Sequence, residues 1–108
     1  MANLHRGEIE ALLGGRSYRL CLTLGALAEL EYAFGAGDLV ALAARFEGGR
    51  LRARDLVTII ACGLRGAGSL LSDEEVAGLA HADGLPGYVD VAGRLLAAAF
   101  GEVAPAHP

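Results

Sequence analysis

The chain has 108 residues, which is enough for one hydrophobic core and too few for two. Its formal net charge of −4 argues against a general DNA-binding protein, because neutralisation of phosphates dominates such affinity. Its longest uncharged runs, Leu20–Ala28 and Leu56–Leu64, are about half of the roughly 18 apolar residues that suggest a membrane-spanning helix, so no membrane span is expected.

The N-terminal part of the chain has the pattern of a β-hairpin. After a lead over residues 1–6 that we expect to be flexible, Glu8–Leu13 and Arg16–Leu22 alternate apolar and polar side chains, as half-buried strands do. The Gly14-Gly15 link between them suits a two-residue turn that requires positive φ. The apolar residues expected to share one face are Ile9, Ala11, Leu13, Tyr18, Leu20 and Leu22.

The hydrophobic period then changes from two to about 3.6 residues without an intervening linker, which predicts a helix directly after the second strand. Thr23 marks the change, and its hydroxyl can cap the first unpaired N–H groups of that helix. The expected helix, Leu24–Phe34, ends at Gly35, a residue typical of helix C-termini. The residues expected on its apolar stripe are Leu24, Leu27, Leu30 and Phe34.

Two more helices are expected in the middle of the chain. Asp38 can cap a helix over Leu39–Glu47, which Gly48-Gly49 terminates. The span from about Ala53 to Leu64 reads as the next helix, although its Thr58-Ile59-Ile60 run leaves a strand open as an alternative. The inward residues of that helix are expected to be Leu56, Ile59, Ile60 and Leu64.

The last third of the chain predicts two helices. Ser72 followed by Glu75 forms a capping box for a short helix over Asp73–His81, and Pro86 fits the first turn of a final helix that runs to about Phe100. The residues available for burial are Val76, Leu79 and Ala80 in the first of these helices and Tyr88, Val91, Ala92, Leu95, Leu96 and Ala99 in the second.

These elements predict an α+β fold in which an N-terminal antiparallel β-hairpin is followed by four to five short helices packed as one small domain. We assign residues 7–101 to this domain and residues 102–108 to a flexible tail. Cys21 and Cys62 lie far apart and form no C-x-x-C pair, so we expect two buried, reduced thiols and a cytoplasmic location.

No pattern of residues indicates catalysis, a cofactor or a metal site. The three histidines are scattered singly, without paired ligand spacing, and no G-x-S-x-G motif or phosphate-binding glycine motif is present. Asp73, Glu74 and Glu75 fit helix capping better than acid–base chemistry. The sequence therefore favours a protein that is not an enzyme.

One local basic cluster is formed by Arg45, Arg50, Arg52 and Arg54. A solvated loop is the favoured interpretation, and contact with an acidic protein or with nucleic acid are the alternatives. Interleaved aromatic residues for base stacking are missing, which weighs against nucleic acid.

The motifs also occur in an order that resembles a known family. The segments that carry the resemblance are LTLGALAELE at 22–31, Gly37–Leu42, Arg54-Asp55-Leu56, Gly63–Gly66, Leu71–Val76, Leu95-Leu96 and Phe100-Gly101. This set resembles a small family encoded among the tail genes of gene transfer agents and related siphophages, whose members are described as tail assembly chaperones or as tail tube proteins. The resemblance covers about residues 5–101.

The resemblance implies non-enzymatic help in tail assembly, most simply by keeping the long tape-measure protein soluble while tube subunits polymerise around it. A structural component of the tail tube or of a tail completion ring, which would be particle-associated, is the alternative. The implied partners are the tape-measure and major tail proteins, with a second copy of the chain as a further candidate. A DNA-linked adaptor that uses the arginine loop is a third hypothesis.

The hairpin suggests where a partner binds. A two-stranded hairpin has two outer edges, and an unpaired edge can accept a strand from another chain. We therefore expect this edge, or an apolar groove beside it, to receive a tail-protein segment or a second copy, unless the N-terminal lead or a helix covers it. The candidate partner-binding residues are Arg19 and Cys21 on the strand and Arg50, Arg52 and Arg54 in the loop.

Overall fold

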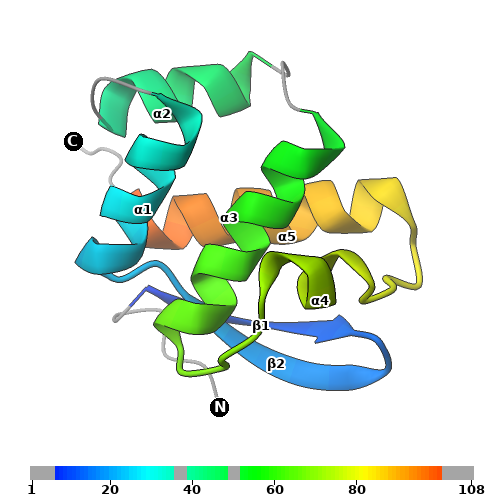
Figure 1. Cartoon of the computed structure of the whole chain (residues 1–108). Coiled ribbons are helices and arrows are strands. Elements are labelled where there is room, and N and C mark those ends of the chain that lie inside the picture. Colours follow the sequence, from blue (N-terminus) through cyan, green and yellow to red (C-terminus); the bar gives the residue numbers. More distant parts are fainter. Residues whose placement is uncertain (1–6, 36–38, 49–51, 101–108) are drawn as a thin grey trace, which may run out of the picture.

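The structure is a computed structural model that describes residues 7–35, 39–48 and 52–100 (Figure 1). The predicted α+β fold is confirmed, because an antiparallel hairpin precedes five helices in the described part of the chain. The predicted lead, the tail, Asp38 and Arg50 lie outside the described residues. The elements in chain order are β1 (Glu8–Leu13), β2 (Arg16–Cys21), α1 (Leu24–Phe34), α2 (Leu39–Glu47), α3 (Ala53–Gly66), α4 (Asp73–Ala77) and α5 (Leu85–Phe100).

The hairpin has the predicted register and buried face. Leu13 pairs with Arg16 and Glu8 with Cys21, and the φ angles of Gly14 and Gly15 are +60° and +80°, as a two-residue hairpin turn requires. The second strand ends one residue earlier than predicted, at Cys21. The residues of the predicted face that are buried are Ile9, Ala11, Leu13, Leu20 and Leu22, with Tyr18 half-buried.

Helix α3 occupies the centre of the fold. Figure 1 shows it crossing the molecule, with α1 on one side, α4 on the other and α5 behind it, and it contacts all three helices as well as β2. The strand alternative at 58–60 is therefore wrong, and the helix continues two residues past its predicted end, to Gly66. The predicted inward residues are all buried: Leu56, Ile59, Ile60 and Leu64.

Two glycines of α3 allow it to lie against the neighbouring elements. A Cβ on Gly66 would overlap the carbonyl oxygen of Cys21 in β2, and a Cβ on Gly63 would overlap the side chain of Leu95 in α5. Glycine permits this close approach of one backbone to another because it has no side chain. The last turn of α3 therefore packs directly on the end of β2.

Helix α1 begins and ends as predicted, but its buried face is rotated. Thr23 Oγ1 accepts a hydrogen bond from the Ala26 N–H at 3.1 Å, and Gly35 ends the helix with φ +67°. Ala26 is buried, and because Leu24 lies about 200° away around the helix, Leu24 turns outward and is 82% exposed. The prediction that Leu24 belongs to the apolar stripe is therefore wrong. Leu27 and Leu30 are buried as predicted.

The capping box of α4 is confirmed, but the helix is shorter than predicted. Ser72 N–H donates to Glu75 Oε1 at 2.9 Å, and Glu75 N–H donates to Ser72 Oγ at 3.1 Å. The helix ends at Ala77 and not at His81, because the following carbonyls bind other elements. The hydroxyl of Tyr88 in α5 donates to Leu79 O at 2.6 Å, and the N–H of Gly14 in the hairpin turn donates to Ala80 O at 2.7 Å.

The burial expected in the two C-terminal helices is confirmed with one exception. Ala80 lies beyond the end of α4 and is exposed, so its predicted place in the core is wrong. Helix α5 begins at Leu85, with Pro86 in its first turn as predicted. The residues that pack inward are Val76, Val91, Ala92, Leu95 and Leu96, which are buried, and Leu79, Tyr88 and Ala99, which are partly buried.

Substitution of Gly66 by alanine tests the close packing of α3 on β2. We expect Gly66→Ala to lower the free energy of unfolding by about 2 kcal/mol, because the added methyl group meets a backbone atom that cannot move aside. Gly78→Ala is the matched control, since its Cβ would meet its nearest atom at 3.6 Å, an ordinary contact. Urea denaturation measures both, and equal stability of the two variants would contradict the packing.

Candidate interaction surfaces

Two members of the predicted arginine cluster, Arg45 and Arg52, lie beside a buried carboxylate at the start of α3. Asp55 is 5% exposed, and its Oδ2 accepts a hydrogen bond from the backbone N–H of Arg52 at 2.9 Å. The guanidinium groups of Arg52 and Arg45 lie 3.6 and 3.7 Å from the same carboxylate. Asp55 thus caps the helix and neutralises two of the arginines, a role that the sequence analysis did not assign to it.

Arg45 further connects α2 to the end of α1. Its Nη1 donates to the carbonyl oxygen of Phe34 at 3.3 Å, and its Cζ lies 5.0 Å from the centre of the Phe34 ring. A cation that lies over an aromatic face and bonds a carbonyl oxygen stabilises the contact between α1 and α2. Through its contacts with Phe34 and Asp55, Arg45 therefore holds α1, α2 and α3 together.

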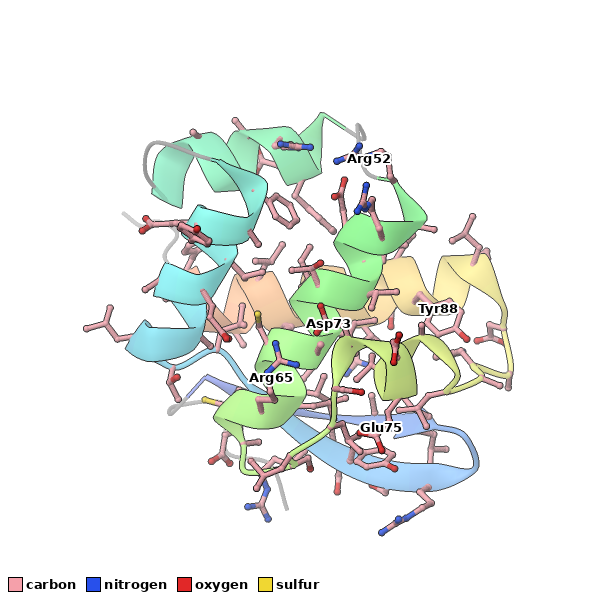
Figure 2. All side chains as sticks on the ribbon, in the orientation of Figure 1. Arg52, Arg65, Asp73, Glu75 and Tyr88 are labelled. Carbon is pink, nitrogen blue, oxygen red and sulfur yellow. The ribbon has the colours of Figure 1, made fainter. Side chains whose placement is uncertain are left out.

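The other candidate residues of the arginine loop differ in their structural contacts. Arg52 lies at the start of α3 in Figure 2 and has the structural contacts given above, whereas the exposed Arg54 side chain has no hydrogen bond or ion pair with the described residues. Arg50 lies outside the described part of the chain. Among the described arginines of this group, Arg54 is therefore the one whose side chain makes no structural contact within the described chain.

A second ionic cluster lies at the other end of α3. Arg65 Nη1 lies 3.0 Å from Asp73 Oδ1 and donates to the carbonyl oxygen of Leu71 at 3.0 Å, and Figure 2 shows Arg65 and Asp73 close together. Its Nη2 lies 3.8 Å from Glu29 Oε1. Arg65 therefore ties α1 to the connection between α3 and α4.

The buried thiol of Cys62 lies beside this cluster. Its Sγ donates a hydrogen bond to Glu29 Oε1 at 3.4 Å. Burial, followed by the hydrogen bond and the negative charge of Glu29, raises the pKa of the Cys62 thiol to about 12. The thiol stays protonated at neutral pH and is not an activated nucleophile. Both cysteines are free thiols, but Cys21 is half-buried, so the predicted burial is correct only for Cys62.

An apolar pocket of about 190 Å³ opens between α3, α4 and α5, next to the hairpin turn. Its rim includes the exposed residues Ala53, Ala77 and Leu85. An engineered cavity of about 150 Å³ binds benzene, so this pocket has room for one large apolar side chain. No charged residue is among its lining residues, which are Leu13, Ala53, Leu56, Val57, Ile60, Val76, Ala77, Leu79, Leu85 and Tyr88.

Among the described residues, the predicted hairpin edge is bonded at Glu10 on β1 and partly open on β2. On β1, Arg94 Nη1 from α5 donates to the carbonyl oxygen of Glu10 at 3.2 Å. On β2, the last turn of α3 covers Cys21 through Gly66. Arg19 is exposed. Arg19 and Cys21 share one strand, whereas Arg52 and Arg54 lie at the far end of α3, so the predicted candidates do not form one site.

Within the described residues, no group of three or more His, Cys, Asp or Glu residues is arranged to hold a metal ion. No described helix has the length and hydrophobicity to cross a membrane.

Removal of the Asp55 carboxylate tests whether this cluster is structural. We expect Asp55→Ala to lower the free energy of unfolding by about 3 kcal/mol, because it removes the cap of α3 and leaves Arg45 and Arg52 without their shared anion. Asp90→Ala is the control, since its ion pair with Arg94 is exposed and such pairs contribute about 0.3–0.5 kcal/mol. Chemical denaturation of both variants checks this, and equal losses would show that the cluster has no structural role.

Comparison with known proteins identifies the family. Searches of curated proteins and of solved structures find no match to the chain. The sequence matches the family described as "Phage tail tube protein, GTA-gp10" over residues 6–102, which is nearly the whole chain and close to the 5–101 span of the resemblance. The chain therefore belongs to this family of phage and gene transfer agent tail proteins.

Proposed function

We propose that this protein is a non-enzymatic assembly factor for a phage-like tail, acting in the cytoplasm. It holds apolar helical segments of the tape-measure protein until tube subunits polymerise around them. The observation that carries this proposal is the uncharged surface pocket between α3, α4 and α5. Membership of a tail-protein family supports the general setting.

The shape of the pocket suits an anchor residue from a partner helix. Amphipathic helices bind grooves by placing apolar side chains at helical spacing into apolar depressions. The three exposed rim residues come from three different helices, so an inserted side chain would contact all of them. Exposed Val89 lies one turn beyond Leu85 on α5 and extends the apolar surface next to the pocket.

The size of the pocket suits reversible binding. Full burial of one Leu or Phe side chain contributes about 1.5–3 kcal/mol, which alone gives only weak affinity. An extended tape-measure protein with repeated apolar patches would recruit several copies, each by a weak contact. Weak contacts can be displaced one by one when tube subunits arrive, as an assembly factor requires.

A structural role in the tail tube is the second candidate, and the family description favours it directly. The small sheet argues against this role. In the described part of the chain the sheet has two strands, β1 and β2, of six residues each. A tube closed through sheets needs larger sheets, and one outward carbonyl of the β1 edge, that of Glu10, is already bonded by Arg94. The helix-rich fold therefore favours the assembly factor.

Co-expression with the tape-measure protein tests the pocket. We expect Leu85→Asp to reduce the amount of tape-measure protein that stays soluble and co-purifies, because it places a charge on the rim of an apolar pocket. The fold should survive, since Leu85 is 61% exposed and an acidic residue is favoured at the start of α5.

Leu70→Asp is the matched control, because Leu70 is 88% exposed and lies outside the pocket, in the connection between α3 and α4. It should leave the yield of soluble complex unchanged. Equal yields with the wild-type chain and with both variants would show that the pocket does not bind the tape-measure protein, and no complex with the wild-type chain would overturn the proposed function.

A further inference from the structure

We propose that the open part of the β2 edge is a second docking surface, which pairs with an extended, acidic segment of a partner protein. This inference does not rest on the apolar pocket or on the tape-measure partner. It rests on backbone groups that face outward from the hairpin and on the charges beside them.

The turn determines which backbone groups face outward. In a two-residue turn the flanking residues, Leu13 and Arg16, form a hydrogen-bonded pair, and along an antiparallel ladder such pairs alternate with pairs that are not hydrogen-bonded. The N–H and C=O groups of Ser17 and Arg19 on β2 therefore point away from β1. The bond from Arg94 to Glu10 O confirms the pattern, because Glu10 pairs with Arg19 and its carbonyl also faces outward.

The outward groups of Ser17 and Arg19 are available for pairing. Both residues are exposed, and no backbone hydrogen bond to these groups comes from the rest of the described chain. At one end of this stretch α3 covers Cys21, and at the other end the turn begins. The open edge is thus a short segment that can accept one strand.

The charges beside this edge favour an acidic strand. Arg16 and Arg19 are exposed, and neither forms an ion pair with a described residue. The Cζ of Arg16 lies 5.4 Å from the centre of the Tyr18 ring. Glu10, opposite Arg19, accepts a hydrogen bond from Ser17 Oγ at 3.2 Å and forms no described ion pair with Arg19. Arg16 and Arg19 lie on opposite faces of the strand, because side chains alternate along it. Carboxylates on either face of an added strand would therefore meet one cation that lacks a described acidic partner.

The same charges disfavour a second copy of the chain as the occupant. Two β2 strands paired about a two-fold axis would bring the arginines of both copies together, and like charges on paired strands are destabilising. The acidic strand β1 of another copy is a poorer partner, because Arg94 from α5 already bonds the outward carbonyl of Glu10. The occupant is therefore an acidic segment of a different protein, and Arg16 and Arg19 act against self-association.

Binding of a designed peptide to the full chain tests this inference. The probe is a fluorescein-labelled peptide of alternating Glu and Thr, about six residues long as strands usually are, and a Lys–Thr peptide of equal length is its control. All carboxylates of the probe lie on one face of the added strand, which we expect to be the face of Arg19 because Arg16 contacts Tyr18 on the other face. Fluorescence anisotropy should show binding of the Glu–Thr peptide that weakens as salt is raised, and no binding of the Lys–Thr peptide. Hydrogen exchange should slow at the N–H groups of Ser17 and Arg19.

Three variants assign the site. Arg19→Glu should weaken binding at least about tenfold, because it replaces an attraction by a repulsion. Arg54→Glu is the matched control, since Arg54 is also exposed and lacks a described side-chain partner but lies on α3; it should leave binding unchanged. Arg19→Pro should abolish binding without removing a β1–β2 hydrogen bond, and circular dichroism checks that it folds.

Several results would overturn the inference. These are no binding of the Glu–Thr peptide, equal binding to Arg19→Glu and to the wild-type chain, and unchanged exchange at Ser17 and Arg19. Loss of binding in Leu85→Asp but not in Arg19→Glu would place the peptide in the apolar pocket instead. Because the pocket and the edge are tested by different variants, failure of one proposal leaves the other standing.

Discussion

The structure depends on the close approach of α3 to β2, which Gly66 and Gly63 make possible. A two-stranded hairpin is marginal in water and needs a partner surface for its apolar face. Helix α3 supplies much of that surface, and it also contacts α1, α4 and α5 (Figure 1). With side chains at these two glycines, α3 would have to move away from β2 and α5. The positions of the remaining elements follow from this contact.

Ionic clusters hold α3 at both ends, and the candidate binding surfaces lie in different places around it. At its start, Asp55 binds Arg45 and Arg52, and near its end Arg65 binds Asp73 and Glu29. The apolar pocket uses the first half of α3, whereas the open edge belongs to β2. The two surfaces differ in chemistry, since one is uncharged and the other basic. Under the two proposals, one small chain engages an apolar helix and an acidic strand at the same time.

The order and type of the elements could be predicted because local signals agree with the fold. These signals are Gly14-Gly15 for the turn, Thr23 and Ser72 for helix starts, and the change of hydrophobic period after β2.

The errors in the prediction have non-local causes. Leu24 is exposed because packing decides the rotation of α1, and α4 ends early because Tyr88 and Gly14 bind the carbonyls that follow it. Asp55 was recognisable as an acidic residue in the first turn of α3, but its burial between two arginines was not. The pocket joins residues from four elements, and no sequence pattern reveals it.

In the proposed function, the protein assists tail assembly without becoming part of the tail. Quantitative mass spectrometry of purified tail-containing particles, compared with the lysate of the producing cells, tests this most directly by counting the chain against the major tail protein. We expect the chain to be abundant in the lysate and nearly absent from particles. A fixed, ring-like copy number in particles would contradict this account and make the protein a structural part of the tail.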